Sequence, residues 1–479
     1  MASSNIHQVQ RTDVATGRRY WTLLLLVAIF LRVFVSLVLL DSTKQTSDAL
    51  HYVSQSQRML EEFPGDRPYF WPPGRSYFLL PSYLAFGVSE TVTNLNAIFI
   101  DVVNVILVAI IAHSVFTRNR SARIAGWLAA AYPPAVMLSG WAYAHNLAML
   151  FLLSSCLLLI LVAKGRFAGL ATRLTACFFS GLFLGCAILT RPSALSVLAA
   201  IVVGGLFIAG HGFLRRMRRP GVETWKHALA CTAILACGSI LPMLFAMRHN
   251  ASLDEGWVVA TNTEMNLFYG NNRYTPHYKT WHWAQRDRNT IADKEVREYY
   301  LSFSERPDAR EAWKKEALQY IARRPDIFLY RTVNRMRCYW GFDYYASRLI
   351  QNQNKLGTGG LIPLLCFEAG GYVIVMLLVL AGLFLARGRG NTSGMLLLLY
   401  FALAYMAPYT LVFSSGTYHI PIMGLLLPFA GMTADELTSN FAETWRKLRS
   451  NWFFALLVVV FILIQCEYAY HIFYHFPGS

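Results

Sequence analysis

Asp48 and Tyr52 are the residues of this chain best suited to chemistry, because they stand four positions apart just after its first long hydrophobic stretch. Residues i and i+4 share one face of a helix, so the carboxyl and phenol groups are expected to point the same way. An ionisable group beside hydrocarbon is costly and commonly marks a site. Such a carboxylate can act as a general base toward an attacking hydroxyl. The structural alternatives are helix capping by Asp48 and membrane-interface anchoring by Tyr52.

Arg191 is the first candidate for the opposite charge at such a site. It interrupts an apolar stretch (CAILTRPSALSVL), where an unpaired cation is expensive. A guanidinium can bind two phosphate oxygens, and a fixed cation stabilises the charge that develops on a departing phosphate. The alternative is a side chain that snorkels toward the headgroups. Arg75, beside Pro72–Pro73–Gly74, is a second candidate of this kind.

The composition places these residues in a membrane protein. Of the 479 residues, 55% are hydrophobic and only 15% are charged, whereas roughly a quarter of a soluble protein is charged. The net charge of +16 is explained by basic loops on the cytoplasmic side and one basic outer segment, so no nucleic-acid partner is expected. The eight cysteines include no CxxC pair, so neither a disulfide framework nor a zinc site is indicated.

The hydropathy pattern predicts an all-α polytopic membrane protein with about eleven transmembrane helices. The expected spans are 20–40, 93–117, 122–140, 146–163, 174–190, 192–210, 227–247, 361–386, 393–413, 417–432 and 451–472. Lys and Arg favour short cytoplasmic loops. They are absent from the connections 141–145 and 414–416 and frequent in the alternate ones. The N-terminal tail, 1–19, is therefore predicted to be cytoplasmic.

Two extracytoplasmic segments are predicted to carry the function. The first, 41–92, belongs to the membrane module 20–247, and the second is the large loop 248–360, which precedes the C-terminal helices 361–479. An amphipathic helix is expected over Ser47–Leu60, where apolar residues recur with helical spacing.

Further helices are expected within these two segments. Residues 76–88 are too few to span a bilayer and are expected to form an interfacial helix. Two more helices, separated at Arg323–Arg324–Pro325, are expected between Pro307 and Trp340. Most basic residues of the second helix, including Arg331 and Arg335, are expected on a solvated or headgroup-binding face.

Four segments, taken in order, make the chain resemble the GT-C membrane glycosyltransferases, in particular the branch with protein O-mannosyltransferases and the lipid A aminoarabinose transferase. The first is Asp48 followed by Trp71–Pro72–Pro73–Gly74, and the second is the Leu189–Thr190–Arg191–Pro192 junction. The others are Asn262 to Asn272 (NTEMNLFYGNN) and Arg324–Pro325 to Arg337–Cys338–Tyr339–Trp340. Together they extend over most of the chain.

The resemblance implies a GT-C fold and inverting transfer of a monosaccharide from a polyprenyl-phosphate carrier to a hydroxyl of a lipid, glycan or protein acceptor. The reaction would occur at the outer face of a bacterial inner membrane, with membrane lipids, the donor and the acceptor as partners. Asp48 would be the catalytic base. The resemblance gives donor-phosphate binding to Arg191, Arg75 and Arg337, and substrate binding to Tyr52, Asn266, Asn271, Asn272, Trp340 and His419.

The sequence departs from the family pattern at three places. Ala49 stands where the family usually has a second acid after the Asp, so a divalent metal is not indicated, although the resemblance leaves room for one. Ala144–His145–Asn146 replaces a Ser-Glu pair, and Thr417 to Pro421 replaces Arg-Tyr-x-x-Pro. His145 and His419 either replace lost polar contacts or are ordinary residues at helix ends.

Two other functions stay open on the sequence alone. One is a GT-C-like ligase or polymerase that uses a diphosphate carrier, which would need a larger cationic patch. The other is a transporter or flippase for lipid-linked sugars, which would need charged or broken helices at mid-membrane. Asp101 and Glu368 are the acidic residues within the expected spans that bear on this alternative. The sequence predicts no oligomeric state.

Overall fold

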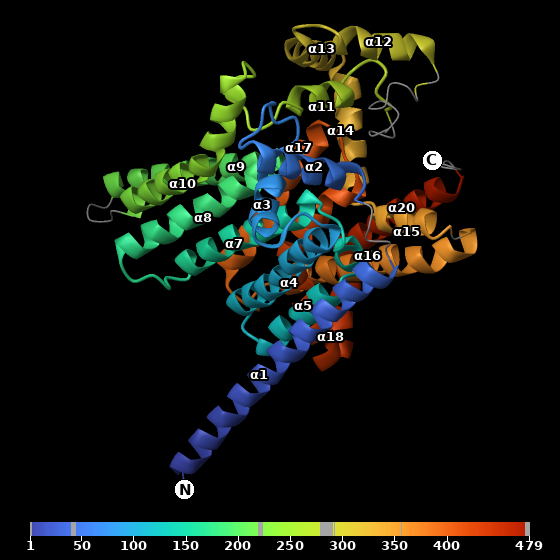
Figure 1. Ribbon diagram of the computed structural model, residues 1–479. Helices are drawn as coiled ribbons and strands as arrows, with labels where there is room; N and C mark the ends of the chain where they lie inside the picture. The colour runs from blue at the N-terminus through green and yellow to red at the C-terminus, as the bar shows by residue number, and fades with distance from the viewer. Residues whose placement is uncertain are drawn as a thin grey trace.

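The computed structural model describes residues 2–39, 45–218, 224–277, 291, 293–355 and 357–474. Their regular secondary structure is helical, and the described pairing of extended segments is limited to one isolated bridge between Phe116 and Gly390. The ribbon in Figure 1 shows a bundle with a long first helix at one end and a group of short helices at the opposite end.

Ten helices among the described residues are long and apolar enough to cross a membrane, which confirms ten of the expected spans. The helix of the expected span 417–432 is longer than predicted, because it continues to Ser439. The ten helices are α1 (Ala2–Phe34), α4 (Glu90–Val115), α7 (Ala144–Ala163), α8 (Leu170–Thr190), α9 (Leu195–Arg218), α10 (Thr224–Ser252), α16 (Thr358–Leu385), α17 (Thr392–Leu411), α18 (Ile420–Ser439) and α20 (Trp452–Tyr474).

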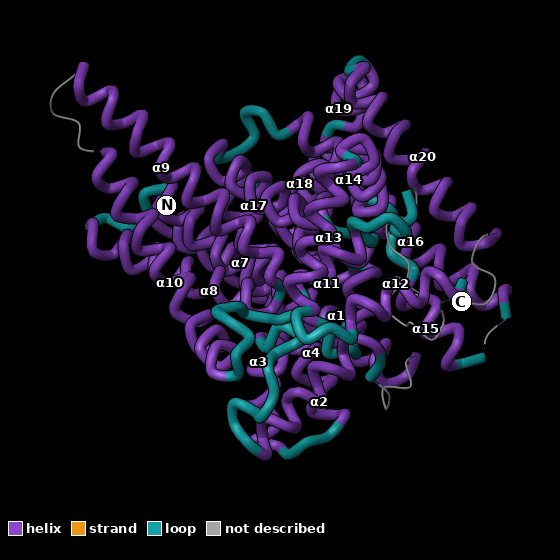
Figure 2. The backbone as a smooth tube through the Cα atoms, turned by 90° about the horizontal axis from the view of Figure 1, so that it is seen from above, coloured by secondary structure: helices purple, strands orange, loops and turns teal. Residues whose placement is uncertain are grey.

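Helix α18 forms the centre of the bundle. Its most apolar 18-residue window is 89% buried inside the protein, whereas the corresponding window of α20 is 11% buried. It packs against α4, α7, α16 and α17. Figure 2 shows α9 and α10 at one side of the bundle and α20 at the other, with α18 between them. The apolar surface of the outer helices is therefore available to lipid.

The expected continuous span 122–140 is wrong, because it is divided into α5 (Asn119–Ala131) and α6 (Pro133–Leu138). Proline has no backbone N–H and ends or kinks a helix. Pro133 and Pro134 therefore leave the carbonyl groups of Ala129 and Ala130, four residues earlier, without their helical donors. Inside a membrane such carbonyl groups need other donors.

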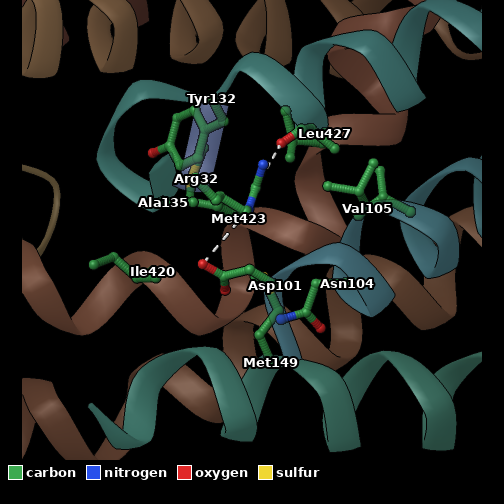
Figure 3. A pocket seen from close by; sticks show the side chains of 12 residues that line it. Arg32, Asp101, Asn104, Val105, Tyr132, Ala135, Met149, Ile420, Met423 and Leu427 are labelled. Atoms are coloured by element: carbon green, nitrogen blue, oxygen red, sulfur yellow. Dashed lines mark hydrogen bonds and ion pairs between the residues drawn. The ribbon is translucent and has the colours of Figure 1, made fainter. Parts of the chain in front are cut away.

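Arg32 of α1 supplies those donors. Its guanidinium donates to the carbonyl of Ala130 over 3.0 Å and to that of Ala129 over 3.5 Å. Asp101 of α4 lies 3.7 Å from Arg32 Nε and compensates its charge, and both side chains are about 1% exposed (Figure 3). The adjoining cavity of about 20 Å³ has room for about one water molecule, so it is too small for a sugar or a lipid headgroup.

Short helices occupy the segments between spans on the side where α1 ends. They are α2 (Ser47–Glu61), α3 (Gly74–Phe86), α11 (Thr263–Gly270), α12 (Lys294–Ser304), α13 (Ala309–Arg323), α14 (Pro325–Tyr339) and α15 (Tyr345–Gln353). Figure 1 shows α12 and α13 at the end opposite to the N-terminus. The expected helices over 47–60 and 76–88 correspond to α2 and α3, and the expected break at Arg323–Arg324–Pro325 separates α13 from α14.

The prediction of a solvated basic face on α14 is wrong for two of its residues. Arg331 and Arg335 are both 0% exposed. Arg331 donates to the carbonyl of Asn272 over 3.1 Å, and Arg335 donates to that of Leu411 over 2.9 Å and also to that of Gly270. These guanidinium groups fasten the end of α11 to α14 and α17, so their charges serve packing inside the outer loop.

Candidate functional site

Asp48 lies near the start of α2, above the membrane-spanning helices. It follows Ser47, whose φ of 53° is in the left-handed region that residues other than glycine rarely adopt. The Asp48 carboxylate is half-buried and accepts no hydrogen bond from the described residues. Tyr52, one turn further along α2, is 1% exposed. The left-handed conformation of Ser47 thus sets the start of α2, and no described hydrogen bond occupies the carboxylate oxygens of Asp48.

Arg191 projects from the break between two spans. A residue before proline is disfavoured in the α conformation, and Arg191 accordingly ends α8 with extended dihedrals (φ −145°, ψ 107°) before Pro192 begins a short 3₁₀ helix, Pro192–Ala194. Its backbone N–H still donates to the carbonyl of Ala187 over 2.7 Å. The Arg191–Pro192 pair therefore ends α8 and fixes the backbone position from which the Arg191 side chain extends.

Gly74 brings the first outer segment against this break. A Cβ atom at this position would lie 2.6 Å from the backbone nitrogen of Thr190, so only glycine allows α3 to begin there. Helix α2 is fastened to α3 in turn, since Ser76 donates to the carbonyl of Tyr52 over 3.0 Å. Through these contacts the Pro-Pro-Gly segment places α2 beside Arg191.

The structure brings Asp48, Tyr52 and Arg191 together. Burial raises the pKa of the Tyr52 phenol, and the opposing charges of Arg191 and Asp48 both reach that phenol. Arg191 is within electrostatic reach of Asp48 and of Tyr409 as well. A carboxylate and a guanidinium from two different segments of the chain thus lie within electrostatic reach of each other and of Tyr52.

Three residues that the sequence did not assign to the site hold Arg191. Arg191 Nη2 donates to His145 Nε2 over 2.7 Å, and the guanidinium carbon lies 5.6 Å from the ring centre of Tyr418. Tyr409 stacks on Tyr418 with ring centres 4.8 Å apart. His145 and Tyr418 fall where the sequence departs from the family pattern, which was a signal for them, whereas Tyr409 lies in a hydrophobic span and gave none.

Arg75 lies deeper than the other site residues. It is 0% exposed, and Nη1 donates to Asn96 Oδ1 over 2.6 Å, while Nε and Nη2 have no partner among the described residues. Burial lowers the pKa of Arg75 to about 10, an effect that Tyr83 and Asp101 oppose. Its charge reaches Tyr52 from the interior, so it adjoins the site without lining its open face.

The structure does not bring Arg337 to the Asp48 site. Its guanidinium forms an ion pair with Glu467 of α20 and lies 6.0 Å from the ring centre of Tyr468. Trp340 and His419 belong to a layer behind Tyr409 and Tyr418, where their rings lie 6.5 Å apart and nearly parallel. His419 Nδ1 bonds the carbonyl of Tyr339 over 2.8 Å, so this histidine is part of the supporting layer.

The asparagines of the second outer segment serve its internal structure. Asn271 Nδ2 donates to the carbonyls of Leu267 and Leu411, each over 3.1 Å. Asn272 is 0% exposed, and its amide nitrogen donates to the carbonyl of Phe268 over 2.8 Å. Asn266 is half-buried on α11. Tyr278, Trp281 and Trp283, whose rings suit sugar stacking or membrane-interface anchoring, lie outside the described residues.

An apolar groove lies next to the last turn of α8, the helix that Arg191 ends. It has a volume of about 390 Å³ and is lined by residues of α3, α8, α10 and the segment before α3, namely Phe63, Tyr77, Leu80, Pro81, Leu84, Leu189, Pro242 and Phe245. Leu189 stands two residues before Arg191, so the groove and the guanidinium share the end of α8. This arrangement suits an amphiphile with an anionic head and a long apolar tail.

A metal site would need several ligating side chains directed at one point. Among the described residues no three or more His, Cys, Asp or Glu side chains are grouped so that they could hold a metal ion.

Solved structures that are similar to this chain include two of the same protein. No protein-family model and no curated protein matches the chain. Both solved structures are of ArnT from Cupriavidus metallidurans. The apo structure is 14% identical, with 88% of this chain and 77% of that chain covered and a TM-score of 0.38. The structure bound to undecaprenyl phosphate is 15% identical, with 87% and 77% covered and a TM-score of 0.39. Similarity this distant leaves the function to be inferred from the site.

Proposed function

We propose that this protein is an inverting GT-C glycosyltransferase that moves a monosaccharide from a polyprenyl-phosphate carrier to a hydroxyl of a lipid, glycan or protein acceptor. The observation that carries the proposal is that Asp48 lies within electrostatic reach of Arg191, which ends the helix whose Leu189 lines an apolar groove. The reaction takes place at the outer face of a bacterial inner membrane, with the N-terminus in the cytoplasm.

Asp48 acts as the general base. The acceptor hydroxyl oxygen attacks the anomeric carbon of the donor, the bond between that carbon and the phosphate oxygen breaks, and the bonding electrons leave with the phosphate. The hydroxyl proton passes to Asp48, whose oxygens accept no hydrogen bond from the described residues and are thus free to receive it. A single displacement of this kind inverts the anomeric configuration.

Arg191 stabilises the departing phosphate. Negative charge increases on the phosphate as the bond breaks, and a guanidinium that is already oriented stabilises this charge without reorganisation. His145 and Tyr418 provide that orientation. Arg75 adds positive potential from the interior near Tyr52, while Arg337 is paired with Glu467 and contributes less.

The groove accommodates the apolar tail of the donor. Its lining is almost wholly hydrophobic and aromatic, and Phe63 and Phe245 stack across it with ring centres 5.5 Å apart. An isoprenoid chain that lies there has its phosphate near the end of α8, where Arg191 projects. Burial of the tail supplies binding free energy of about 25 cal/mol for each square ångström of apolar surface.

Asp101 and Glu368, the span acids that bear on a transporter, do not favour one. Asp101 is paired with Arg32, which completes the broken helix α5. Glu368 Oε2 accepts a hydrogen bond from the backbone N–H of Ser347 over 2.9 Å and fastens α15 to α16. Both carboxylates thus have a packing role. A diphosphate carrier is also less favoured, since the Arg337 guanidinium is engaged by Glu467.

The test replaces Asp48 by Asn and, as a matched control in the same outer segment, the exposed Asp66 by Asn. Purified, reconstituted protein is incubated with synthetic polyprenyl-phosphate sugars and a mixed acceptor extract, and released polyprenyl phosphate is measured. Loss of a general base is expected to lower release by about 10²- to 10⁴-fold, with Asp66→Asn close to the parent protein. Full turnover by Asp48→Asn would remove the assignment of the base.

Two further measurements separate the alternatives. Parallel reactions with polyprenyl diphosphate sugars test the ligase or polymerase alternative. We expect transfer from the diphosphate carrier to be slower than transfer from the monophosphate carrier. A flux assay with labelled lipid-linked sugar in proteoliposomes tests the flippase. Flux without covalent transfer would favour the transporter over the enzyme.

A further inference from the structure

His145 forms a contact that fixes its protonation. It is the second residue of α7 and is 3% exposed. Its Nε2 lies 2.7 Å from Arg191 Nη2. A guanidinium has only N–H donors, so Nε2 must be the acceptor and must carry a lone pair. The imidazole is therefore neutral, with its single proton on Nδ1.

The Nδ1–H group has no hydrogen-bond partner among the described residues. A buried donor without a partner is rare in folded proteins and calls for an explanation. The Nε atom of Arg191 is likewise without a partner among those residues. His145 Nδ1–H and Arg191 Nε–H, on two side chains that contact each other, thus both lack a hydrogen-bond acceptor among the described residues.

The other titratable groups around His145 do not supply an acceptor for Nδ1. On the segment before α7 the ring of Tyr143 lies 6.2 Å away, and on the 3₁₀ helix Gly416–His419 the ring of Tyr418 lies 5.9 Å away. His419 reaches His145 electrostatically. On α4, Asp101 is paired with Arg32. The described side chains thus leave Nδ1–H without an acceptor, and an oxygen from outside the chain can supply one.

We propose that His145 is a positioning and phosphate-binding residue, which orients Arg191 through Nε2 and donates its Nδ1–H to an oxygen of the phosphate of the bound donor or product. This inference rests on the proposed function and identifies a second phosphate contact for the same site. The shared ligand chemistry is a phosphate oxygen, from either a lipid-linked phosphate or free inorganic phosphate.

Phosphate binding through His145 should depend on pH. Protonation of Nε2 would remove the acceptor and would place two cations 2.7 Å apart. Acid is therefore expected to release Arg191 and to weaken phosphate binding through His145 itself. A variant that keeps an acceptor at the Nε2 position but cannot be protonated should lose this acid sensitivity.

Two substitutions separate the two nitrogen atoms of the ring. The side-chain oxygen of glutamine can reach the position of Nε2, whereas the amide nitrogen of asparagine reaches that of Nδ1. His145→Gln thus keeps the contact with Arg191 and loses the Nδ1 donor, and His145→Asn does the reverse. The exposed His51 of α2 provides the matched control, His51→Gln.

The probes are a fluorescent polyprenyl monophosphate and, in parallel, inorganic phosphate, titrated against the full-length protein in nanodiscs from about pH 5 to about pH 8. The parent protein and His51→Gln are expected to bind the lipid probe more weakly in acid. His145→Gln should bind about tenfold more weakly at neutral pH without further loss in acid, and His145→Asn about a hundredfold more weakly.

Nitrogen-15 NMR of labelled histidine, with the His145 signal identified by difference from His145→Gln, reports the tautomer independently of function. A proton on Nε2 would overturn the proposal. So would equal binding by both variants and the parent protein, or an acid loss retained in His145→Gln. Failure of the parent protein to bind the lipid probe would instead overturn the proposed function, and with it the ligand named here.

Discussion

Removing either member of the Arg32–Asp101 pair should destabilise the protein without acting on the reaction itself. Asp101→Asn leaves the Arg32 guanidinium charged and buried, although still bonded to the carbonyls of Ala129 and Ala130. Arg32→Met has two effects, because it leaves the carboxylate unpaired and also strips both carbonyls of their donors. The second substitution is therefore expected to be the more harmful.

The magnitudes follow from the distances. Charges 3.7 Å apart attract by about 4 kcal/mol at an effective dielectric constant of about 20. Loss of one partner from a buried pair commonly costs about 3–5 kcal/mol, and each orphaned carbonyl costs about 1–3 kcal/mol. We expect about 3 kcal/mol for Asp101→Asn and about 5 kcal/mol or more for Arg32→Met. The double variant should be less destabilised than the sum of the two by about 3 kcal/mol.

Reversible unfolding by sodium dodecyl sulfate in mixed micelles, followed by circular dichroism, measures these free energies of unfolding. The exposed pair Glu443–Lys447 serves as control, and Glu443→Gln should cost less than about 1 kcal/mol. Strictly additive effects at Arg32 and Asp101 would refute the pairing. A large loss of turnover per folded molecule in Asp101→Asn, with unchanged stability, would refute the packing role and reopen the transporter.

Three further predictions concern the outer segments. Gly74→Ala places a Cβ 2.6 Å from the backbone nitrogen of Thr190. Thermal unfolding should therefore show a free energy of unfolding that is lower by about 1–3 kcal/mol, and titration with the donor should show weaker binding. Unchanged values would contradict the contact. Gly270→Ala should detach α11 from the Val412 carbonyl and increase proteolysis of the loop, whereas a parent-like digestion pattern would count against it. Burial raises the pKa of Asp343 to about 6, so the folded state binds this proton more tightly than the unfolded state does. The free energy of unfolding should therefore fall by roughly 3 kcal/mol as the pH rises from about 4 to about 6, and it should not change further at higher pH. The free energy of unfolding of Asp343→Asn should lack this dependence on pH.

The sequence predicted the spans well because hydropathy is a local property. It failed at 122–140, where the pattern is apolar throughout but Pro133 and Pro134 end the helix. A proline pair in a membrane helix is tolerated only where other groups satisfy the freed carbonyls. The group that does so here, Arg32, is about a hundred residues away in the chain, and no local pattern contains that information.

The basic residues of α14 illustrate the same limit. Arg331 and Arg335 have the spacing of a solvated helical face, yet both are fully buried because carbonyl groups of α11 and α17 accept their hydrogen bonds. Asn271 and Asn272 were predicted from their motif to contact sugar, and their amide nitrogens donate to backbone carbonyls of α11 and, for Asn271, also of α17. The types of these residues indicated that they form polar contacts, but residue type alone could not indicate which groups they contact.

For the candidate site, the motifs led to Asp48, Tyr52 and Arg191 as members of one constellation, and the structure brings these three side chains together. The reason is visible at Gly74, whose missing side chain allows α3 to contact Thr190. His145 was apparent only as a departure from a family pattern. Its importance depends on a contact with Arg191, which comes from a different helix.

Several arginines of this protein differ in what holds them, and this difference favours Arg191 as a residue that can meet a ligand. Arg32, Arg331 and Arg335 direct their N–H groups at backbone carbonyls, and Arg337 is neutralised by Glu467. Arg191 is held by a neutral imidazole and by the face of a phenol ring, which orient a guanidinium without cancelling its charge. Because no carboxylate forms a salt bridge with Arg191 among the described residues, its positive potential remains directed at the space it shares with Asp48. An anion that enters this space gains a charge-assisted contact that the folded chain alone does not satisfy.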